Sequence, residues 1–275
     1  STNGSDLICL TGFTSSTFNI ASTGAFQTNF NGEWDAFLTT FNFNGQRLWG
    51  TYYGESELDK GNSCAFDGKG GIYFVGETSC TNGISTPGIH QPTFGGGNYD
   101  GFLAKFNIIG QRIWCTYYGG DSTDILNGLS IGDSANVYVT GRTQSTINIA
   151  SNGAFQLTNN GNSDAFIAKI NPDGQRIWGT YYGGPGYDIA NNISLDTTET
   201  IPKIYIAGLT TSTDSVSTSG SHQPIFGGGN YDDFLIRFDN CTIPDSAGII
   251  TGPSEVCQFS SGIRYSIPSI VNASG

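Results

Sequence analysis

The stretch Asp100–Gly119, DGFLAKFNIIGQRIWCTYYG, decides the fold because the chain repeats it. Near-copies start at Asp35 and Asp164, and a fourth copy starts at Asp232 and continues only as DDFLIRF. One unit is therefore about 65 residues long, a period that is typical of repeat architectures. Agreement at this level across the copies predicts structurally equivalent units.

Each unit carries four strand signals. In the unit quoted above, residues 100–107 mix aromatic, aliphatic and polar side chains, and a turn at Ile109-Gly110 leads into the run 112–119. Residues 127–133 and 136–143 form a second pair of strand signals, and a loop of about 20 residues then precedes the next Asp. Four short antiparallel strands per repeat, without helical periodicity, predict an all-β fold made of β-propeller blades; a solenoid is the alternative.

The phase of the blades follows by analogy with other propellers. Residues 127–143 should give the two inner strands of a blade, and the Asp-Ala-Phe and Arg-x-Trp runs the two outer ones. Repeats then start at about residues 7, 61, 127 and 190 within a partial propeller of residues 1–241. So short an arc does not close a ring, and the chain has no Met, so we expect an excerpt with further blades upstream.

Composition narrows the classes of partner. The 40 Gly and 12% charged residues fit short strands joined by tight turns. A net charge of −12 with only 11 Lys and Arg argues against nucleic acid, and the absence of a long apolar run argues against membrane insertion. An acidic soluble surface is the ordinary interpretation, and cation binding is the functional alternative.

Cysteine and histidine give no metal signature. The six Cys are sparse and form no CxxC pair; Cys241 and Cys257 are the pair that we suspect of bridging, and we expect the other four to be free or buried. His90 and His222 stand where Phe26 stands in the first copy, in GIHQ, GSHQ and GAFQ. A position that accepts either Phe or His is more often a packing position than a metal ligand.

The stretches TGFTSSTFNIASTGAFQTNF, GNSDAFIAKINPDGQRIWGTYYGG and GRTQSTINIASNGAFQ closely resemble the SBBP repeat, which is named for a seven-bladed β-propeller, over roughly residues 7–240. The resemblance implies a secreted or cell-surface bacterial protein, often of the Bacteroidetes type, and no catalytic residues. Residues 242–275, with IITGPSEVCQFSSGIRYSIPSI, look like the truncated start of a PKD-like or immunoglobulin-like β-sandwich module. Such modules often precede a sorting domain of the type IX secretion pathway.

Two sets of side chains are candidates for binding. Aromatic residues of the long loops suit stacking on sugars, and the candidates are Phe26, Phe94, Tyr99, Phe155 and Tyr231. In the connections between blades an Asp is followed three residues later by an Asn, which suggests a ring of oxygen ligands for Ca²⁺ at the channel mouth. These residues are Asp59, Asp124 and Asp188 with Asn62, Asn127 and Asn191. Capping of turns is the alternative for the Asp residues.

Other repeated residues favour structural roles. The carboxylates of Asp35, Asp100, Asp164 and Asp232 can accept backbone N–H groups of the preceding turn. The Trp at 49, 114 and 178, each two residues after an Arg, suits packing between blades, with the Arg lying across the ring, better than sugar binding. In each Tyr-Tyr pair one ring should face inward and the other outward, where it is open to a ligand or ties down the next loop.

Enzyme signatures do not occur in this sequence. It contains no GxSxG, no catalytic Cys motif and no phosphate-binding loop followed by a helix. The first hypothesis is therefore a non-enzymatic extracellular scaffold that presents a binding or adhesion surface, with glycans or surface proteins as partners and no cofactor beyond Ca²⁺. The alternatives are a carbohydrate-binding propeller, and a hydrolase or lyase whose site at the channel mouth would show carboxylates with raised pKa values.

Overall fold

The computed structural model describes residues 1–2, 6–198 and 202–239. These residues form strands and a single short 3₁₀ turn, Asp133–Ala135, so the predicted all-β class is confirmed. The strands are β1 (Leu7–Thr14), β2 (Asp35–Asn42), β3 (Arg47–Tyr53), β4 (Asp59–Phe66), β5 (Gly71–Thr78), β6 (Asp100–Asn107), β7 (Arg112–Tyr118), β8 (Asp124–Ile131), β9 (Val137–Thr143), β10 (Asp164–Ile170), β11 (Arg176–Tyr182), β12 (Asp188–Asp196), β13 (Lys203–Thr210) and β14 (Asp232–Asp239).

The strands form four antiparallel sheets in which each strand pairs with its neighbours in the sequence. The sheets are β1-β2-β3, β4-β5-β6-β7, β8-β9-β10-β11 and β12-β13-β14. Two sheets of four strands flanked by two of three, within the described ranges, have the strand order of propeller blades. The first strands begin at Asp59, Asp124 and Asp188, slightly before the predicted repeat starts at 61, 127 and 190.

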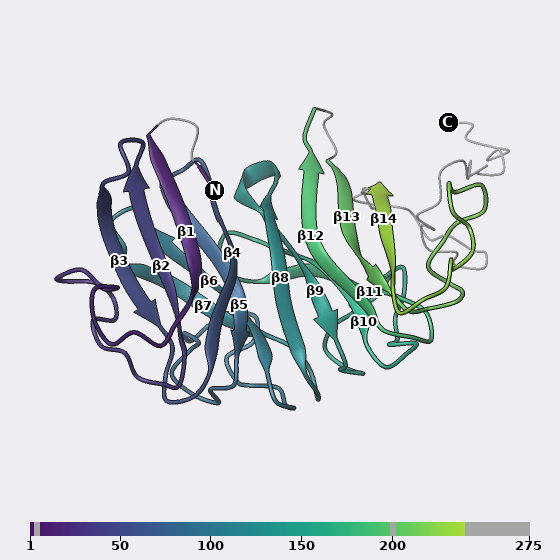
Figure 1. Ribbon diagram of the computed structural model, residues 1–275, viewed down its shortest axis with the longest axis horizontal. Coiled ribbons are helices and arrows are strands. Elements are labelled where there is room, and N and C mark those ends of the chain that lie inside the picture. Colours follow the sequence, from purple (N-terminus) through teal and green to yellow (C-terminus); the bar gives the residue numbers. More distant parts are fainter. Residues whose placement is uncertain (3–5, 199–201, 240–275) are drawn as a thin grey trace, which may run out of the picture.

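Successive sheets converge at their first strands. Figure 1 shows the sheets following one another in a row from the purple to the yellow end of the described chain. The strands β4, β8 and β12 contact one another in turn. In the first sheet β1, β2 and β3 match the second, third and fourth strands of the other sheets, and β1 contacts β4. These contacts place β4, β8 and β12 next to one another, the arrangement expected of the inner strands of successive blades.

A β-bulge explains why the first strands meet. The pairing register of β4 with β5 shifts between Gly61 and Ser63, and that of β8 with β9 shifts between Leu126 and Gly128, so the Asn between them leaves the ladder. The freed Asn62 amide donates to the carbonyl of Leu126 in the next sheet, at 2.9 Å. The repeat thus uses one unpaired residue per first strand to fasten neighbouring sheets.

Glycine is required opposite one of these bulges. At Gly141 in β9, a Cβ would lie 1.8 Å from the carbonyl oxygen of Ile125 in β8. The Ile125 carbonyl is held by the packed sheet and cannot move that far, so any side chain at Gly141 must push β8 and β9 apart.

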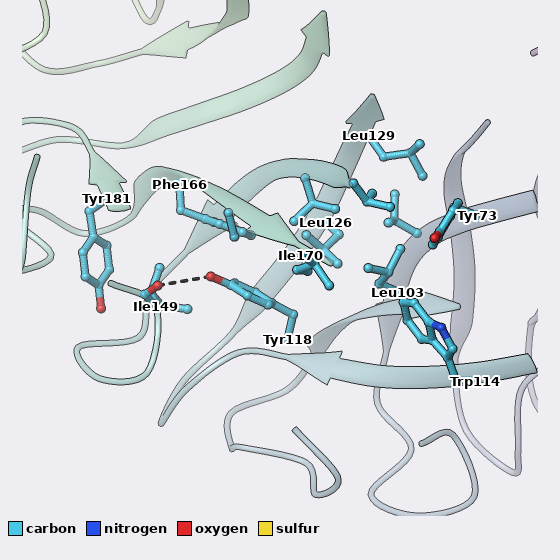
Figure 2. Packing of buried hydrophobic residues seen from close by; sticks show 14 residues of the cluster. Tyr73, Leu103, Trp114, Tyr118, Leu126, Leu129, Ile149, Phe166, Ile170 and Tyr181 are labelled. Atoms are coloured by element: carbon cyan, nitrogen blue, oxygen red, sulfur yellow. Dashed lines mark hydrogen bonds between the residues drawn. The ribbon is translucent and has the colours of Figure 1, made fainter. Parts of the chain in front are cut away.

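Hydrophobic side chains fill the space between sheets. Figure 2 shows the cluster between the second and third sheets, to which Tyr73 and Trp114 contribute from one side and Leu126, Phe166 and Ile170 from the other. Each such side chain contributes about 1.5–3 kcal/mol when fully buried. Every sheet packs against its sequence neighbours, so the core is a series of layers.

Trp and Arg of the fourth strands have separate packing roles. The indole nitrogens of Trp49 and Trp114 donate to carbonyls in turns of the next sheet, those of Ile108 (2.8 Å) and Pro172 (2.9 Å), which confirms the packing interpretation. Arg112 donates to the carbonyl of Ile84 at 2.9 Å. The guanidinium therefore anchors the long loop of its own sheet instead of lying across the Trp ring.

The cysteine predictions are tested in part. Cys9, Cys64, Cys80 and Cys115 are free thiols, as expected. Cys241, Cys257 and the predicted module of residues 242–275 lie outside the described residues.

Candidate functional site

The long loops and the connections between sheets lie at the same end of the sheets, the lower end in Figure 1. The loops span residues 15–34, 79–99, 144–163 and 211–231, and the connections span 54–58, 119–123 and 183–187. Antiparallel pairing places them together, because the first and third strands of a four-stranded sheet start at this edge and the second and fourth strands end there. We call this edge the loop end.

A row of Asp, Thr and Asp crosses the second, third and fourth sheets at the loop end, and the first sheet has the pair Thr14 and Asp35. In the third sheet Asp124 pairs with Thr143, which pairs with Asp164 on its other side, and all three are fully buried. Residues in register on adjacent strands project from the same face. The equivalent rows are Asp59, Thr78 and Asp100, and Asp188, Thr210 and Asp232.

The first Asp of each row caps two chain segments. Oδ2 of Asp124 accepts the backbone N–H of Gly120 at 2.7 Å and the hydroxyl of Ser145 at 2.6 Å. The carboxylate thus ties the connection between sheets to the start of the long loop. Matching pairs of bonds reach Asp59 from Glu55 and Cys80, and Asp188 from Gly184 and Ser212. Turn capping, the alternative role allowed by the sequence, is the role that these hydrogen bonds show.

The Asp that opens each third strand works with a glutamine. Oδ2 of Asp100 accepts the N–H of Gly95 at 2.6 Å and the side-chain amide of Gln91 at 3.1 Å. The Gln91 amide oxygen accepts the N–H of Gly119 at 2.9 Å. Gln27 and Gln156 make the same bridge, and Gln223 makes its bond to Asp232. Sequence reasoning missed these glutamines, although each follows the repeated Phe or His of GAFQ and GIHQ.

The same glutamines pair the long loop with the fourth strand. The backbone N–H of Gln91 donates to the hydroxyl of Thr116 at 2.9 Å, and the N–H of Tyr117 donates to the carbonyl of Gln91 at 3.1 Å. Gln27 with Thr51 and Tyr52, and Gln156 with Thr180 and Tyr181, repeat both bonds. Each fourth strand is therefore held between the third strand and the long loop.

Both tyrosines of each Tyr-Tyr pair are buried. The hydroxyl of Tyr117 donates to the carbonyl of Cys80 in the loop of its own sheet, at 2.8 Å. The hydroxyl of Tyr118 donates to the carbonyl of Ile149 in the loop of the next sheet, at 3.1 Å (Figure 2). The prediction that one ring faces outward toward a ligand is wrong, because both rings of each pair are buried; the alternative, a hydroxyl that ties down a loop, is confirmed. The other pairs, Tyr52-Tyr53 and Tyr181-Tyr182, do the same.

Carboxylates of neighbouring sheets converge around a glycine. A Cβ at Gly119 would lie 2.7 Å from Oδ1 of Asp100 and 2.6 Å from Oδ2 of Asp124. Gly183 stands in the same way between Asp164 and Asp188. In the described part of the chain, the Oδ1 atoms of Asp59, Asp100, Asp124 and Asp164 are buried without a hydrogen-bond partner. Acceptor capacity is therefore left over in the interior.

These carboxyl groups titrate near neutral pH. Burial, with a smaller contribution from the charge of Asp124, raises the pKa of Asp100 to about 7, although the hydrogen bonds from Gly95 and Gln91 lower it. Burial likewise raises the pKa of Asp124 to about 6, although the hydroxyl of Ser145 lowers it. The pKa values of Asp59 and Asp164 are also raised to about 6 by burial. Raised carboxyl pKa values recur in the first, second and third sheets, so they do not single out one centre.

The predicted Asp and Asn set does not meet as one cluster. The amides of Asn62 and Asn127 donate to the carbonyls of Leu126 and Ala190 in the next sheet, and Asn191 is exposed. Within the described ranges, no group of three or more His, Cys, Asp or Glu side chains is placed to hold a metal ion. Calcium binding by Asp59, Asp124 and Asp188 stays a prediction; Asp59 and Asp124 each keep a buried Oδ1 without a hydrogen-bond partner, whereas Oδ1 of Asp188 accepts the hydroxyl of Thr210.

The loop aromatics lie apart from one another. Phe155 stacks on Tyr182 with ring centroids 6.0 Å apart, and Phe94 meets the edge of Tyr117 at 5.9 Å. Tyr231 is 55% exposed. Phe26 packs on Tyr53 and Phe106, and Tyr99 is half-buried. Phe26 and Phe155 combine these ring contacts with a large exposed fraction, and Tyr231 is the one most open to a ligand among the five.

His90 takes the packing position that the repeat predicts. Its ring lies 5.8 Å from that of Tyr118, and its backbone N–H donates to the carbonyl of Gly174 in the next sheet at 3.0 Å. Burial lowers the pKa of His90 to about 4, so the imidazole is neutral at physiological pH.

An exposed aromatic pair lies at the loop end of the first sheet, and sequence reasoning missed it. Phe13 and Trp34 stack with centroids 4.5 Å apart and planes 13° from parallel, and they are 46% and 39% exposed. Nζ of Lys60 lies 5.6 Å and 5.8 Å from the two rings and 2.8 Å from the carboxylate of Glu77. Trp34 occupies the position of Tyr99 directly before the strand Asp, which is the signal that could have identified it.

Comparison with known proteins does not assign this chain to a family. No family model and no curated protein matches this chain. The described residues contain no helix that is long and apolar enough to cross a membrane.

Proposed function

We propose that this chain is a non-enzymatic, SBBP-like repeat scaffold of a secreted or cell-surface bacterial protein, and that its loop end presents a surface for binding or adhesion. The observation that carries the proposal is the repeated anchoring of the long loops. Equivalent Asp, Gln and Tyr side chains fix the long loop in each of the three sheets that contain β3, β7 or β11. Rigid loops at one end of a scaffold are the usual carriers of binding residues.

Equivalence of the sheets favours a scaffold over a catalyst. Asp59, Asp124 and Asp188 are all fully buried and all engaged in equivalent caps. A catalytic centre needs groups that differ in pKa and exposure, and the repeat supplies the same groups several times. The Bacteroidetes source, the PKD-like module in residues 242–275 and export by the type IX pathway belong to this proposal through the resemblance of the sequence alone.

Binding is tested with the whole chain on a glycan array and on a panel of purified bacterial surface proteins. We expect saturable binding that is lost when the exposed loop residue Ile147 is replaced by Asp and kept when Ile109 is replaced by Asp. Ile109 is equally apolar and exposed, but it lies in a hairpin at the opposite end of the sheets. Turnover of chromogenic ester, glycoside or peptide substrates that disappears in Asp124→Asn would overturn the non-enzymatic scaffold.

Carbohydrate binding is the second candidate, because Phe13 and Trp34 form an exposed stacked platform. Sugar C–H faces pack on such rings, and the adjacent Lys60 and Glu77 offer a donor and an acceptor for hydroxyl groups. Trp34→Ala should abolish glycan binding, whereas Phe18→Ala, which removes an isolated ring that is 73% exposed, should not. Equal binding by both variants would remove the platform from consideration.

A further inference from the structure

Within the described residues, the sheet β12-β13-β14 leaves a groove along its outer strand. Among the described residues this sheet ends at β14, and a groove of about 1280 Å³ runs between β14 and the long loop of residues 211–231. Phe155 and Tyr182 of the preceding sheet, Val216 and Phe226 of the loop and the length of β14 line it.

The other sheets show what fills this position. There β3, β7 and β11, with the sequences RLWGTYY, RIWCTYY and RIWGTYY, pair with the third strand of their sheets. The long loop holds the same strand on its other side, because Thr86 N–H donates to the carbonyl of Cys115, Gln91 N–H to the hydroxyl of Thr116, and Tyr117 N–H to the carbonyl of Gln91. The strand is thus bonded on both sides.

The loop of the last sheet keeps the conformation that receives such a strand. Its sequence STSGSHQ, residues 217–223, matches STPGIHQ, residues 85–91. Gln223 donates to the carboxylate of Asp232 at 2.9 Å, as Gln91 does to Asp100. The hydroxyl of Ser217 donates to the carbonyl of Pro224 at 2.6 Å, as that of Ser85 does to Pro92. The receiving side is therefore formed in a sheet that has only three described strands.

We propose that this groove binds an added β-strand of the pattern Arg-x-Trp-(Gly or Cys)-Thr-Tyr-Tyr, antiparallel to β14. By equivalence with the filled sheets, the Thr hydroxyl of that strand accepts the N–H of Gln223, and its first Tyr donates its N–H to the carbonyl of Gln223. The Tyr hydroxyl reaches the carbonyl of Ser212, and the Arg reaches that of Val216. The ring of the first Tyr covers Phe226, as Tyr117 covers Phe94.

The sequence of this chain gives the chemistry of the occupant. Its three Tyr-Tyr pairs and the Trp residues that precede them are already built into β3, β7 and β11. Residues 240–275 contain neither Trp nor a Tyr-Tyr pair. The groove therefore selects a further strand of the same repeat type, by backbone pairing along β14 and by pockets for alternate side chains.

The test adds a fluorescein-labelled peptide of residues 174–184, GQRIWGTYYGG, to the intact chain and follows fluorescence anisotropy. We expect saturable binding that weakens about tenfold or more in a peptide carrying Thr180→Val and Tyr181→Ser, because the bonds to the loop are lost. Hydrogen exchange of the β14 amides should slow when the first peptide is present.

A protein variant checks the position of the peptide. Gln223→Ala should weaken binding, whereas Ile177→Ala, which alters an exposed residue of the filled third sheet, should leave it unchanged. Failure of the peptide to bind, equal binding of the altered peptide, or protection of strands other than β14 would each overturn the proposal. The comparison of the two peptides on the unmodified chain decides the matter even if a protein variant fails to fold.

Discussion

Raising the pH from about 5 to about 8 should destabilise this protein, because the buried carboxyl groups at the loop end must then ionise in the folded chain. Burial raises the pKa of Asp100 from 3.8 to about 7. A carboxyl group with a folded pKa above its unfolded one holds its proton more tightly in the folded state. The free energy of unfolding therefore falls as the pH rises from the unfolded pKa through the folded one.

The magnitude follows from the size of the shift. One pKa unit corresponds to about 1.4 kcal/mol, so Asp100 accounts for at most about 4 kcal/mol between about pH 4 and pH 8. Asp59, Asp124 and Asp164, whose pKa values are raised to about 6, act in the same direction. A loss of several kcal/mol is large against the 5–15 kcal/mol that stabilise a typical domain.

The variant Asp100→Asn isolates one of these groups. Asn keeps an oxygen that can accept from Gly95 and Gln91, and its amide faces Oδ2 of Asp124 across Gly119. We expect the variant to be more stable than the parent at about pH 8 and to show a shallower dependence of stability on pH.

Urea denaturation followed by circular dichroism at a series of pH values measures this dependence. The control is Asp121→Asn, because hydrogen bonds from Thr146 lower the pKa of Asp121, which is therefore ionised across the whole range. A stability that is constant or rises between about pH 5 and pH 8, or an unchanged slope in Asp100→Asn, would refute the reasoning.

Further variants test the packing and the predicted ion site. Gly141→Ala should cost several kcal/mol in urea denaturation because its Cβ meets a carbonyl, whereas Gly45→Asn, at a turn with positive φ and open space, should cost about 1 kcal/mol or less. Asn127→Ala removes a bond between first strands and should cost about 1 kcal/mol by the same measurement; no change would show that sheet contact does not depend on it. Trp114→Phe should lower stability by about 1 kcal/mol or more through the lost indole hydrogen bond, and an unaltered midpoint would contradict this. If Ca²⁺ binds at the loop end, millimolar CaCl₂ should raise the free energy of unfolding at about pH 8 by RT ln(1 + [L]/Kd), which is measured as a higher Tm. Asp124→Asn should abolish this rise, and a Tm that does not change with Ca²⁺ would exclude the site.

The strands could be predicted from the sequence because the strand bounds that the repeat indicates are the bounds over which the strands pair. The run 100–107 is a strand with the bounds that alternation and the following turn indicate, and its pairing with the run that starts at Arg112 follows from the short turn. Beyond the strands, a single sequence shows which way alternate side chains point but not what covers each face. For that reason the prediction that one ring of each Tyr-Tyr pair faces outward was wrong.

The site was predictable only where a residue acts on its own neighbourhood. Asp100 caps the turn directly before it, and the sequence suggests as much. Gln91 joins a loop, a third strand and the end of a fourth strand, and no local pattern contains all three. The spacing of Asp124 and Asn127 suggested a shared ligand set, but the bulge removes Asn127 from the ladder and turns its amide to the next sheet.

The bonds that join one sheet to the next have a consequence for how such proteins change in length. The second sheet reaches the third through the Trp114 indole, the Tyr118 hydroxyl and the Asn62 amide, and each of these donates to a backbone carbonyl. A main-chain acceptor is present whatever side chain the successor carries, so these three hydrogen bonds do not depend on the successor's side chains, and only the hydrophobic packing does. A duplicated or deleted unit would therefore meet the same joint on both sides, and genes of this type can gain or lose whole units by recombination without a new interface having to evolve.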